Sequence, residues 1–170
     1  MEARRLTKMA LLTALLCVSA WISFPLPFSP VMVTALTLVA TLTGLLLSPK
    51  DTFIVFIVYV LLGTVGLPVF VGGTAGLGKL FGPTGGFIFS WPVAYTLLSY
   101  LKGSKVSFVS YTWRSLAITI PVVYIIGVAG FMLVTQMPLD KAIWAAMIPY
   151  IPGDIIKCIV ASWLATKLKF

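Results

Sequence analysis

Six long apolar runs follow one another along this chain of 170 residues, with only short polar segments between them. A helix of about 20 apolar residues can cross the hydrocarbon core of a bilayer. Only 9% of the residues are charged, against about 25% in a soluble domain, so the chain cannot cover a water-soluble surface. We therefore predict an all-α integral membrane protein, a single domain over residues 1–170 with six transmembrane helices. The expected spans are residues 6–24, 31–47, 52–66, 84–101, 113–135 and 142–168.

The basic residues indicate the orientation of these spans, because cytoplasmic loops carry an excess of Lys and Arg. With the N-terminus inside, Lys79 and Lys141 lie outside and Lys157 lies within the last run, while nine basic residues lie inside. These nine are Arg4, Arg5, Lys8, Lys50, Lys102, Lys105, Arg114, Lys167 and Lys169. Both termini are therefore expected in the cytoplasm. The net charge of +8 is explained by topology and does not indicate a nucleic-acid partner.

A glycine-rich stretch, residues 67–87, connects the third and fourth runs and is expected on the extracytoplasmic side. Irregular backbone is tolerated at membrane depth only where protein buries it or where it lines a cavity. The stretch therefore indicates a binding site, although a flexible turn with a solvated lysine is the alternative. Glycine allows the backbone to approach a ligand closely, and Lys79 is a candidate partner for a ligand carboxylate. The candidate ligand residues of this stretch are Phe70, Gly72, Gly73, Thr74, Lys79, Thr84 and Gly85.

The same stretch matches most of a phosphate-binding loop, since Gly73 to Lys79 fits the spacing GxxxxGK. The Ser or Thr that would hold magnesium is replaced by Leu80. The expected topology also places the stretch away from cytoplasmic ATP. A nucleotide site is therefore rejected.

The last apolar run contains an acid and a base, Asp154 and Lys157, three residues apart on one helix face. Ionisable side chains inside the membrane are costly and usually mark function, although a purely structural ion pair is the alternative. Pro149 and Pro152 interrupt the helix just before the pair. Asp154 is then expected near a new helix start, where its charge is favoured.

These two features are expected to form one pocket that is open to the outside and covered by the glycine-rich stretch. Phe70, Phe87, Trp91 and Tyr150 are the aromatic residues that could pack an apolar ligand body. The chain has no His and only two Cys, so neither a metal site nor acid–base catalysis is expected. The protein is therefore predicted to bind a small molecule and not to be an enzyme.

A third pattern lies in the first run, where Ala10 and Ala14 are spaced four residues apart. Small residues at this spacing let two helices approach closely in lipid. Ordinary packing within the bundle is the alternative to a partner contact.

Taken together, these motifs resemble the BioY family, the biotin-capturing S components of energy-coupling factor (ECF) vitamin transporters. The resemblance covers essentially the full length. It rests on GLPVF at residues 66–70 followed by Gly72 and Gly73, on LFGPTGGF at residues 80–87, and on IPGDIIK at residues 151–157.

The resemblance implies a chain in a prokaryotic cytoplasmic membrane that binds biotin in an outward-facing cavity capped by loops. It implies a membrane-embedded T component and two cytoplasmic ATPases as partners, with ATP used by the ATPases and no cofactor in this chain. The family's sixth-helix aspartate and lysine match Asp154 and Lys157, and its docking motif for the T component matches Ala10 and Ala14.

The chain departs from the expected chemistry in one respect, because it has no Asn and a single Gln, Gln136. If relatives hold the ureido ring with an amide side chain, a backbone group or Thr74 must replace it here. The cation for the carboxylate is either Lys79 or a more distant residue. The alternatives in function are an S component for another vitamin, a stand-alone secondary transporter driven by an ion gradient, and a small intramembrane enzyme that uses Asp154 and Lys157.

Overall fold

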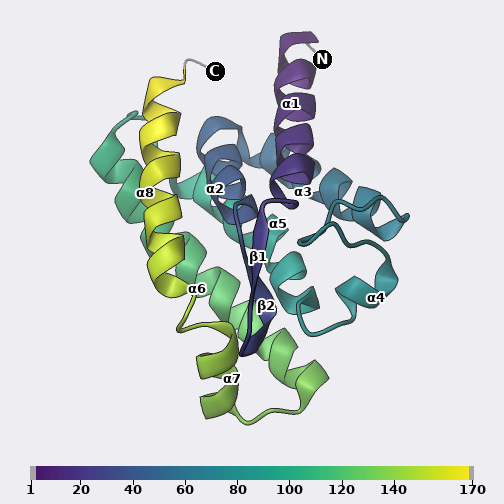
Figure 1. The fold of residues 1–170 in the computed structure, drawn as a ribbon. Helices are drawn as coiled ribbons and strands as arrows, with labels where there is room; N and C mark the ends of the chain where they lie inside the picture. Colours follow the sequence, from purple (N-terminus) through teal and green to yellow (C-terminus); the bar gives the residue numbers. More distant parts are fainter. Residues whose placement is uncertain (1–2, 169–170) are drawn as a thin grey trace.

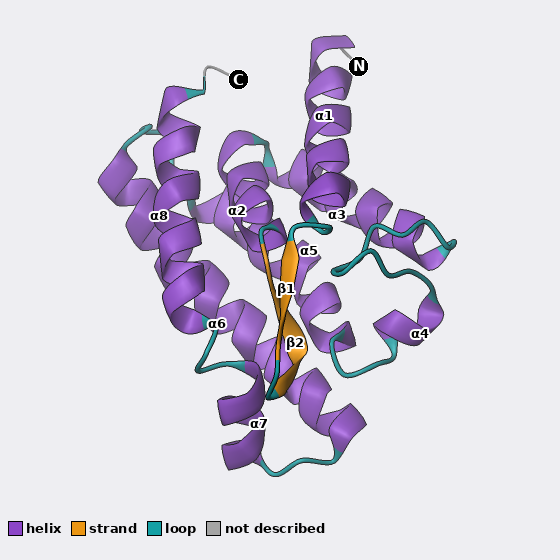
Figure 2. Cartoon of the chain, in the orientation of Figure 1, coloured by secondary structure: helices purple, strands orange, loops and turns teal. Residues whose placement is uncertain are grey.

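The computed structural model describes residues 3–168, and the predicted cytoplasmic Lys169 lies outside this range. The described chain is mostly helical, with one two-stranded antiparallel sheet (Figures 1 and 2). The two ends of the chain lie at the same end of an elongated bundle, and α7 lies at the other end (Figure 1). A chain that crosses a membrane an even number of times has both termini on the same side, and this arrangement agrees with that.

The first two predicted spans were wrong in extent, because the chain between them forms a β-hairpin. Helix α1 covers Ala3–Ser19 and α2 covers only Leu36–Leu46, while β1 (Ser23–Leu26) pairs with β2 (Ser29–Thr34). Prolines at 25, 27 and 30 lack the N–H that a helix interior needs. The β-branched residues of β2 favour the strand, and the Ala35 N–H donates to the Ile22 carbonyl at 2.9 Å to close the hairpin.

Helix α3 (Pro49–Thr64) begins with a well-formed cap and leads into the glycine-rich stretch. The Ser48 side chain accepts from the Asp51 N–H at 3.3 Å, and Pro49 occupies the first turn, where its missing N–H is tolerated. The stretch itself contains one short helix, α4 (Leu77–Leu80), and ends at α5 (Gly85–Leu101). Thr84 occupies the N-cap position of α5, but its hydroxyl makes no capping hydrogen bond.

The C-terminal part of the chain agrees with the predicted interruption of the last span. Helix α6 (Phe108–Thr135) is followed by α7 (Leu139–Ala146) and α8 (Ile151–Lys167), and the two last helices are bent by 48° relative to each other. Pro152 lies in the first turn of α8, and Asp154 lies in the same turn, as expected. The break thus brings Asp154 to the start of a helix.

Of the helices in residues 3–168, α6 alone is long and apolar enough to cross a membrane by itself, and the bent α7–α8 pair qualifies as a second crossing. Helix α2, with 11 residues, extends only about 16 Å, roughly half of a hydrocarbon core. Strand β2 immediately precedes α2 in the chain and extends from the start of that helix toward α7 (Figure 1). The hairpin thus extends from the ends of α1 and α2 toward the end of the bundle opposite the termini.

Close contacts between glycines and aromatic rings hold the centre of the bundle together. A side chain at Gly86 would come within 2.9 Å of the Gly130 Cα, and one at Gly130 within 2.6 Å of the Gly86 Cα, so α5 and α6 can approach closely only because both positions are glycine. The Phe70 ring occupies the space where Gly63 has no side chain, and it meets the Tyr59 ring edge-on at 5.9 Å. These contacts fix the glycine-rich stretch against α3.

Candidate functional site

A cavity of about 670 Å³, including its open mouth, lies between the hairpin, α2, the glycine-rich stretch, α5, α6 and α8. Most of its lining is apolar or aromatic, with a few polar groups at defined positions. The lining residues are Pro30, Val31, Met32, Thr34, Thr37, Val71, Lys79, Thr84, Phe87, Ile88, Trp91, Val123, Tyr124, Ala146, Tyr150, Asp154 and Lys157.

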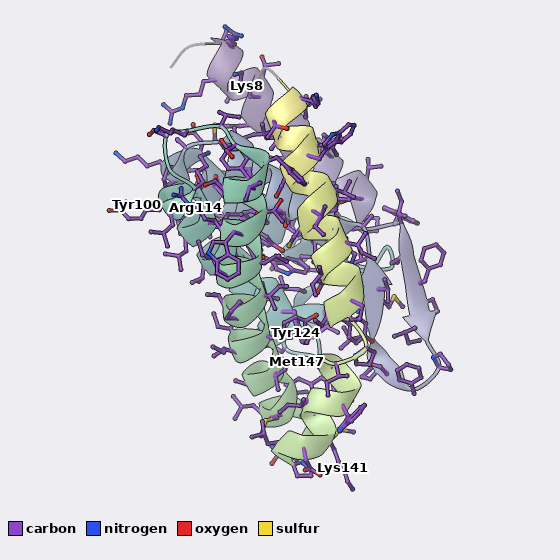
Figure 3. All side chains as sticks on the ribbon, turned by 90° about the vertical axis from the view of Figure 1, so that its left-hand side faces the viewer. Lys8, Tyr100, Arg114, Tyr124, Lys141 and Met147 are labelled. Carbon is purple, nitrogen blue, oxygen red and sulfur yellow. The ribbon has the colours of Figure 1, made fainter. Side chains whose placement is uncertain are left out.

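The Asp154 carboxylate is the centre of the polar contacts in this cavity. Lys157 Nζ lies 3.0 Å from Asp154 Oδ1, and the Tyr124 hydroxyl donates to Oδ2 at 2.5 Å. The Thr37 hydroxyl lies 3.4 Å from Oδ1. Figure 3 shows Tyr124 between α6 and the first turns of α8. Three elements, α2, α6 and α8, therefore hold one carboxylate in place.

Hydrogen-bonding capacity remains in this network. An ionised carboxylate has about four acceptor positions, and Tyr124, Lys157 and Thr37 occupy three of them. An ammonium group has three donors, and Lys157 directs one of them to Asp154. Each side chain is 17% exposed, so both face the cavity. The pair can therefore accept one N–H from a ligand and donate to one ligand oxygen.

The walls around the pair suit an apolar ring system. Trp91 is 3% exposed and lines the cavity from α5, as its position within the fourth apolar run indicated. The Phe87 and Tyr124 rings meet edge-on with centroids 6.2 Å apart, a favourable aromatic geometry. The Tyr150 hydroxyl donates to the Val31 carbonyl and so ties the start of α8 to β2.

Lys79 lines the same cavity from α4 and is half-buried. Burial lowers the pKa of its ammonium group. Together with Asp154 and Lys157 it gives the lining a net charge of +1, because two lysines face one aspartate. An anionic group on the ligand would therefore be attracted to the Lys79 side of the cavity.

Six of the predicted ligand residues line this cavity: Lys79, Thr84, Trp91, Tyr150, Asp154 and Lys157. The other five, Phe70, Gly72, Gly73, Thr74 and Gly85, lie outside the lining. A ligand role for any of the eleven stays a prediction. The Phe70 side chain is fully buried in the core.

The remaining four positions have packing roles in the structure. Gly72 lies against Met32 of the hairpin, and Gly73 lies against the Trp21 ring. The Thr74 hydroxyl donates to the Val71 carbonyl at 3.0 Å. A side chain at Gly85 would overlap the Leu80 carbonyl. The glycines of this stretch thus let its backbone pack against the hairpin and against itself.

The sequence did not indicate a site role for the residues of the hairpin. It also did not indicate one for Thr37 of α2 or Tyr124 of α6. The hairpin contributes Pro30, Val31, Met32 and Thr34 to the lining. Three prolines within six residues were the available signal for it. Tyr124 carried a weaker signal, since a hydroxyl group in the middle of a long apolar helix requires a partner.

Ala10 and Ala14 both lie on an exposed face of α1. The residues that α1 buries against the bundle are Met9, Leu12, Leu16 and Ser19. The face with the two alanines is therefore free of contacts within the described chain and accessible to another helix.

The profile of the BioY family matches residues 1–170, the full length of the chain. The chain belongs to the BioY family. A biotin transporter BioY of Thermotoga maritima is 36% identical to it over 98% of this chain and 96% of the relative. The biotin transporter BioY2 of Lactococcus lactis is 34% identical, over 92% of this chain and 85% of the relative.

Among solved structures, the chain resembles the S component for biotin from an ECF-type ABC transporter. The TM-score is 0.91 over 99% of this chain and 94% of the solved chain, at 24% sequence identity. The likeness establishes that this mostly helical fold is that of an S component. A transporter family together with the apolar span of α6 makes the chain a membrane protein.

Proposed function

We propose that this chain is the biotin-binding S component of an ECF-type vitamin transporter. The observation that carries the proposal is the Asp154–Lys157 pair, placed with spare hydrogen-bonding capacity in an otherwise apolar cavity. The relatives named as biotin transporters and the fold of a biotin S component support it. Binding would be the whole of its chemistry, with no cofactor and no catalytic residue.

The chemistry of biotin matches the lining group by group. Its ureido ring offers N–H donors and one carbonyl oxygen, which suit the free acceptor of Asp154 and the free donors of Lys157. Its thiophane ring and aliphatic chain suit the aromatic and aliphatic walls, including Trp91. Its carboxylate carries the charge that Lys79 attracts. Thr34 and Thr84 are further polar groups in the lining, whereas Thr74 lies outside it.

We further propose that residues 1–170 form one membrane domain with six crossings and both termini in the cytoplasm, in a prokaryotic cytoplasmic membrane. Lys8 and Arg114 lie toward one end of the bundle and Lys141 lies at the other (Figure 3), in keeping with the positive-inside rule. In this orientation the hairpin and the glycine-rich stretch lie on the extracytoplasmic side and cover the cavity.

The proposed partners are a T component and two ATPases, which would supply the energy of transport through ATP hydrolysis. The exposed face of α1 with Ala10 and Ala14 is the proposed docking site for the T component. Replacing both alanines with Leu should abolish co-purification with the T component while biotin affinity stays unchanged. Co-purification at the wild-type level would place the docking site elsewhere.

Titration calorimetry of the purified protein with biotin, in the absence of ATP, tests the function directly. We expect saturable binding at one site, and no competition by riboflavin or thiamine. Binding of another vitamin in place of biotin would make the chain an S component of different specificity. Uptake into proteoliposomes that contain this chain without ATPases, driven by an ion gradient, would instead indicate a secondary transporter.

A further inference from the structure

A second, smaller cavity of about 280 Å³ lies on the other side of the Asp154–Lys157 pair. It shares five lining residues with the larger cavity, so the ion pair separates the two. The shared residues are Thr37, Val123, Tyr124, Asp154 and Lys157, and the residues found only in the smaller cavity are Thr41, Tyr95, Thr119, Ile120 and Cys158. Most of these side chains carry a polar atom, in contrast to the apolar walls of the larger cavity.

The polar side chains continue beyond this cavity along the contact between α6 and α8. Asp154, Cys158 and Ser162 follow one another at intervals of four residues on α8, which places them on one helix face. Ser115 lies one turn before Thr119 on α6. Figure 1 shows both helices extending toward the end of the bundle that carries the termini.

Two of these groups have no partner within the described chain. The hydroxyls of Ser115 and Ser162 are fully buried and form no hydrogen bond. Unpaired polar groups in a protein interior are destabilising by about 1–3 kcal/mol each, and the great majority are satisfied by protein or by ordered water. Ser115 and Ser162 line neither cavity, so a polar partner for them would lie beyond the smaller cavity along the same contact.

The partners around the smaller cavity are those that water requires. The hydroxyls of Thr41 and Thr119 donate to backbone carbonyls at 2.8 Å, and the Thr119 oxygen also lies 3.8 Å from the Cys158 sulfur. An oxygen that donates in this way can still accept from a water molecule. Lys157 keeps donors free on the same side. An internal water needs two to four polar partners, and the lining of this cavity offers them. Asp154 and Lys157 both lie in its wall, so the lining has no net charge, which suits a neutral molecule.

We propose that the smaller cavity is an internal water site that hydrates the inner side of the Asp154–Lys157 pair and extends along the contact between α6 and α8 toward Ser115 and Ser162. Water there stabilises both charges at membrane depth while the outer cavity is empty. The proposal concerns the chain without ligand, so it holds whatever molecule the outer cavity binds.

Radiolytic footprinting tests this site, because hydroxyl radicals made from bound water modify the side chains next to it. Tyr95 is 2% exposed and lines the smaller cavity, whereas Tyr59 is fully buried and lines neither cavity. In the ligand-free protein in detergent, we expect mass spectrometry to show Tyr95 modified about ten times faster than Tyr59. Equal, background rates for the two tyrosines would mean that the cavity is dry and would overturn the proposal.

A variant identifies the polar partners of the water. Thr119→Val keeps the shape of the side chain and removes its oxygen, and it should lower the modification rate of Tyr95 several-fold. Thr13→Val on α1, where the hydroxyl donates to the Met9 carbonyl outside both cavities, should leave that rate unchanged. An unchanged rate in Thr119→Val would exclude water at Thr119. Neither experiment uses biotin, so its outcome is independent of the proposed function.

Discussion

Two aspartate-centred ion pairs in this molecule have similar chemistry and different surroundings. Arg5 of α1 pairs with Asp51 in the first turn of α3, and Lys157 pairs with Asp154 in the first turn of α8. The Arg5 guanidinium reaches both oxygens of Asp51, with Nε at 2.9 Å from each. The Arg5 side chain is 44% exposed, and neither residue borders the larger cavity.

The difference between the pairs lies in what their geometry leaves unused. Arg5 contacts Asp51 in a bidentate arrangement that uses both carboxylate oxygens. This contact joins α1 to α3. Lys157 meets Asp154 through a single oxygen, and both groups keep free positions that face a cavity. The Asp154–Lys157 pair, which keeps free hydrogen-bonding positions beside a cavity, is suited to binding a ligand. The bidentate Arg5–Asp51 pair, which joins two helices, is suited to stabilising the fold.

Removing the charge of Asp154 should have the largest effect on biotin affinity. In Asp154→Asn we expect biotin affinity to fall about 100-fold, because a hydrogen bond to a charged acceptor contributes up to about 3 kcal/mol. The same change at Asp140, which is exposed on α7, is the matched control and should leave the dissociation constant unchanged. Equal affinity of both variants in calorimetry would remove Asp154 from the site.

A variant of Lys79 tests whether this lysine, on the other side of the cavity, binds the ligand carboxylate. Lys79→Gln should weaken biotin binding about tenfold, the equivalent of one charge-assisted hydrogen bond. Binding of biotin methyl ester, which lacks the charge, should be nearly the same in variant and wild type. Lys141→Gln on α7 serves as the control. A tenfold loss for the ester as well would show that Lys79 contacts another part of the ligand.

Tyr124 tests whether the carboxylate must be held in place to bind. Tyr124→Phe removes the hydroxyl that donates to Asp154, and we expect affinity to fall about five-fold, near 1 kcal/mol. Tyr111→Phe on the same helix lies outside both cavities and is the control. If the two variants bind biotin equally well, Asp154 needs no support from α6.

The Arg5–Asp51 pair should affect the stability of the fold and the pH dependence of that stability. Its effect on biotin binding should be the smallest of the four. Arg5 lowers the pKa of the Asp51 carboxyl, so the pair stabilises the fold above the ordinary aspartate pKa, about 3.9. This stabilisation is lost as the pH falls through the lowered pKa. In Arg5→Gln the thermal unfolding midpoint should drop slightly at neutral pH and begin to converge with wild type only as the pH falls below about 4. A change in biotin affinity would contradict the separation of the two roles.

The sequence predicted the parts of the molecule whose signal is local. The prolines before Asp154 define the start of α8, and the spacing of Asp154 and Lys157 places both on one face. Trp91 was among the aromatic residues that could pack an apolar ligand body, and it lines the cavity.

The parts that could not be predicted depend on contacts between distant segments. Residues 20–35 are uncharged throughout, so average hydropathy cannot distinguish a hairpin from a helix there. Five of the seven predicted ligand residues in the glycine-rich stretch lie outside the cavity lining. Glycine also serves close packing, as Gly73 does against Trp21. Tyr124 reaches Asp154 only because α6 and α8 pack together, and no pattern within α6 shows this.

A crystal structure of the protein with biotin tests the central claim most directly. We expect the bicyclic ring between Trp91 and the first turns of α8, with a ureido nitrogen within hydrogen-bond distance of the Asp154 carboxylate and the ureido oxygen at Lys157. Biotin bound elsewhere, with Asp154 and Lys157 in contact only with each other, would show that the pair is structural and would contradict the account.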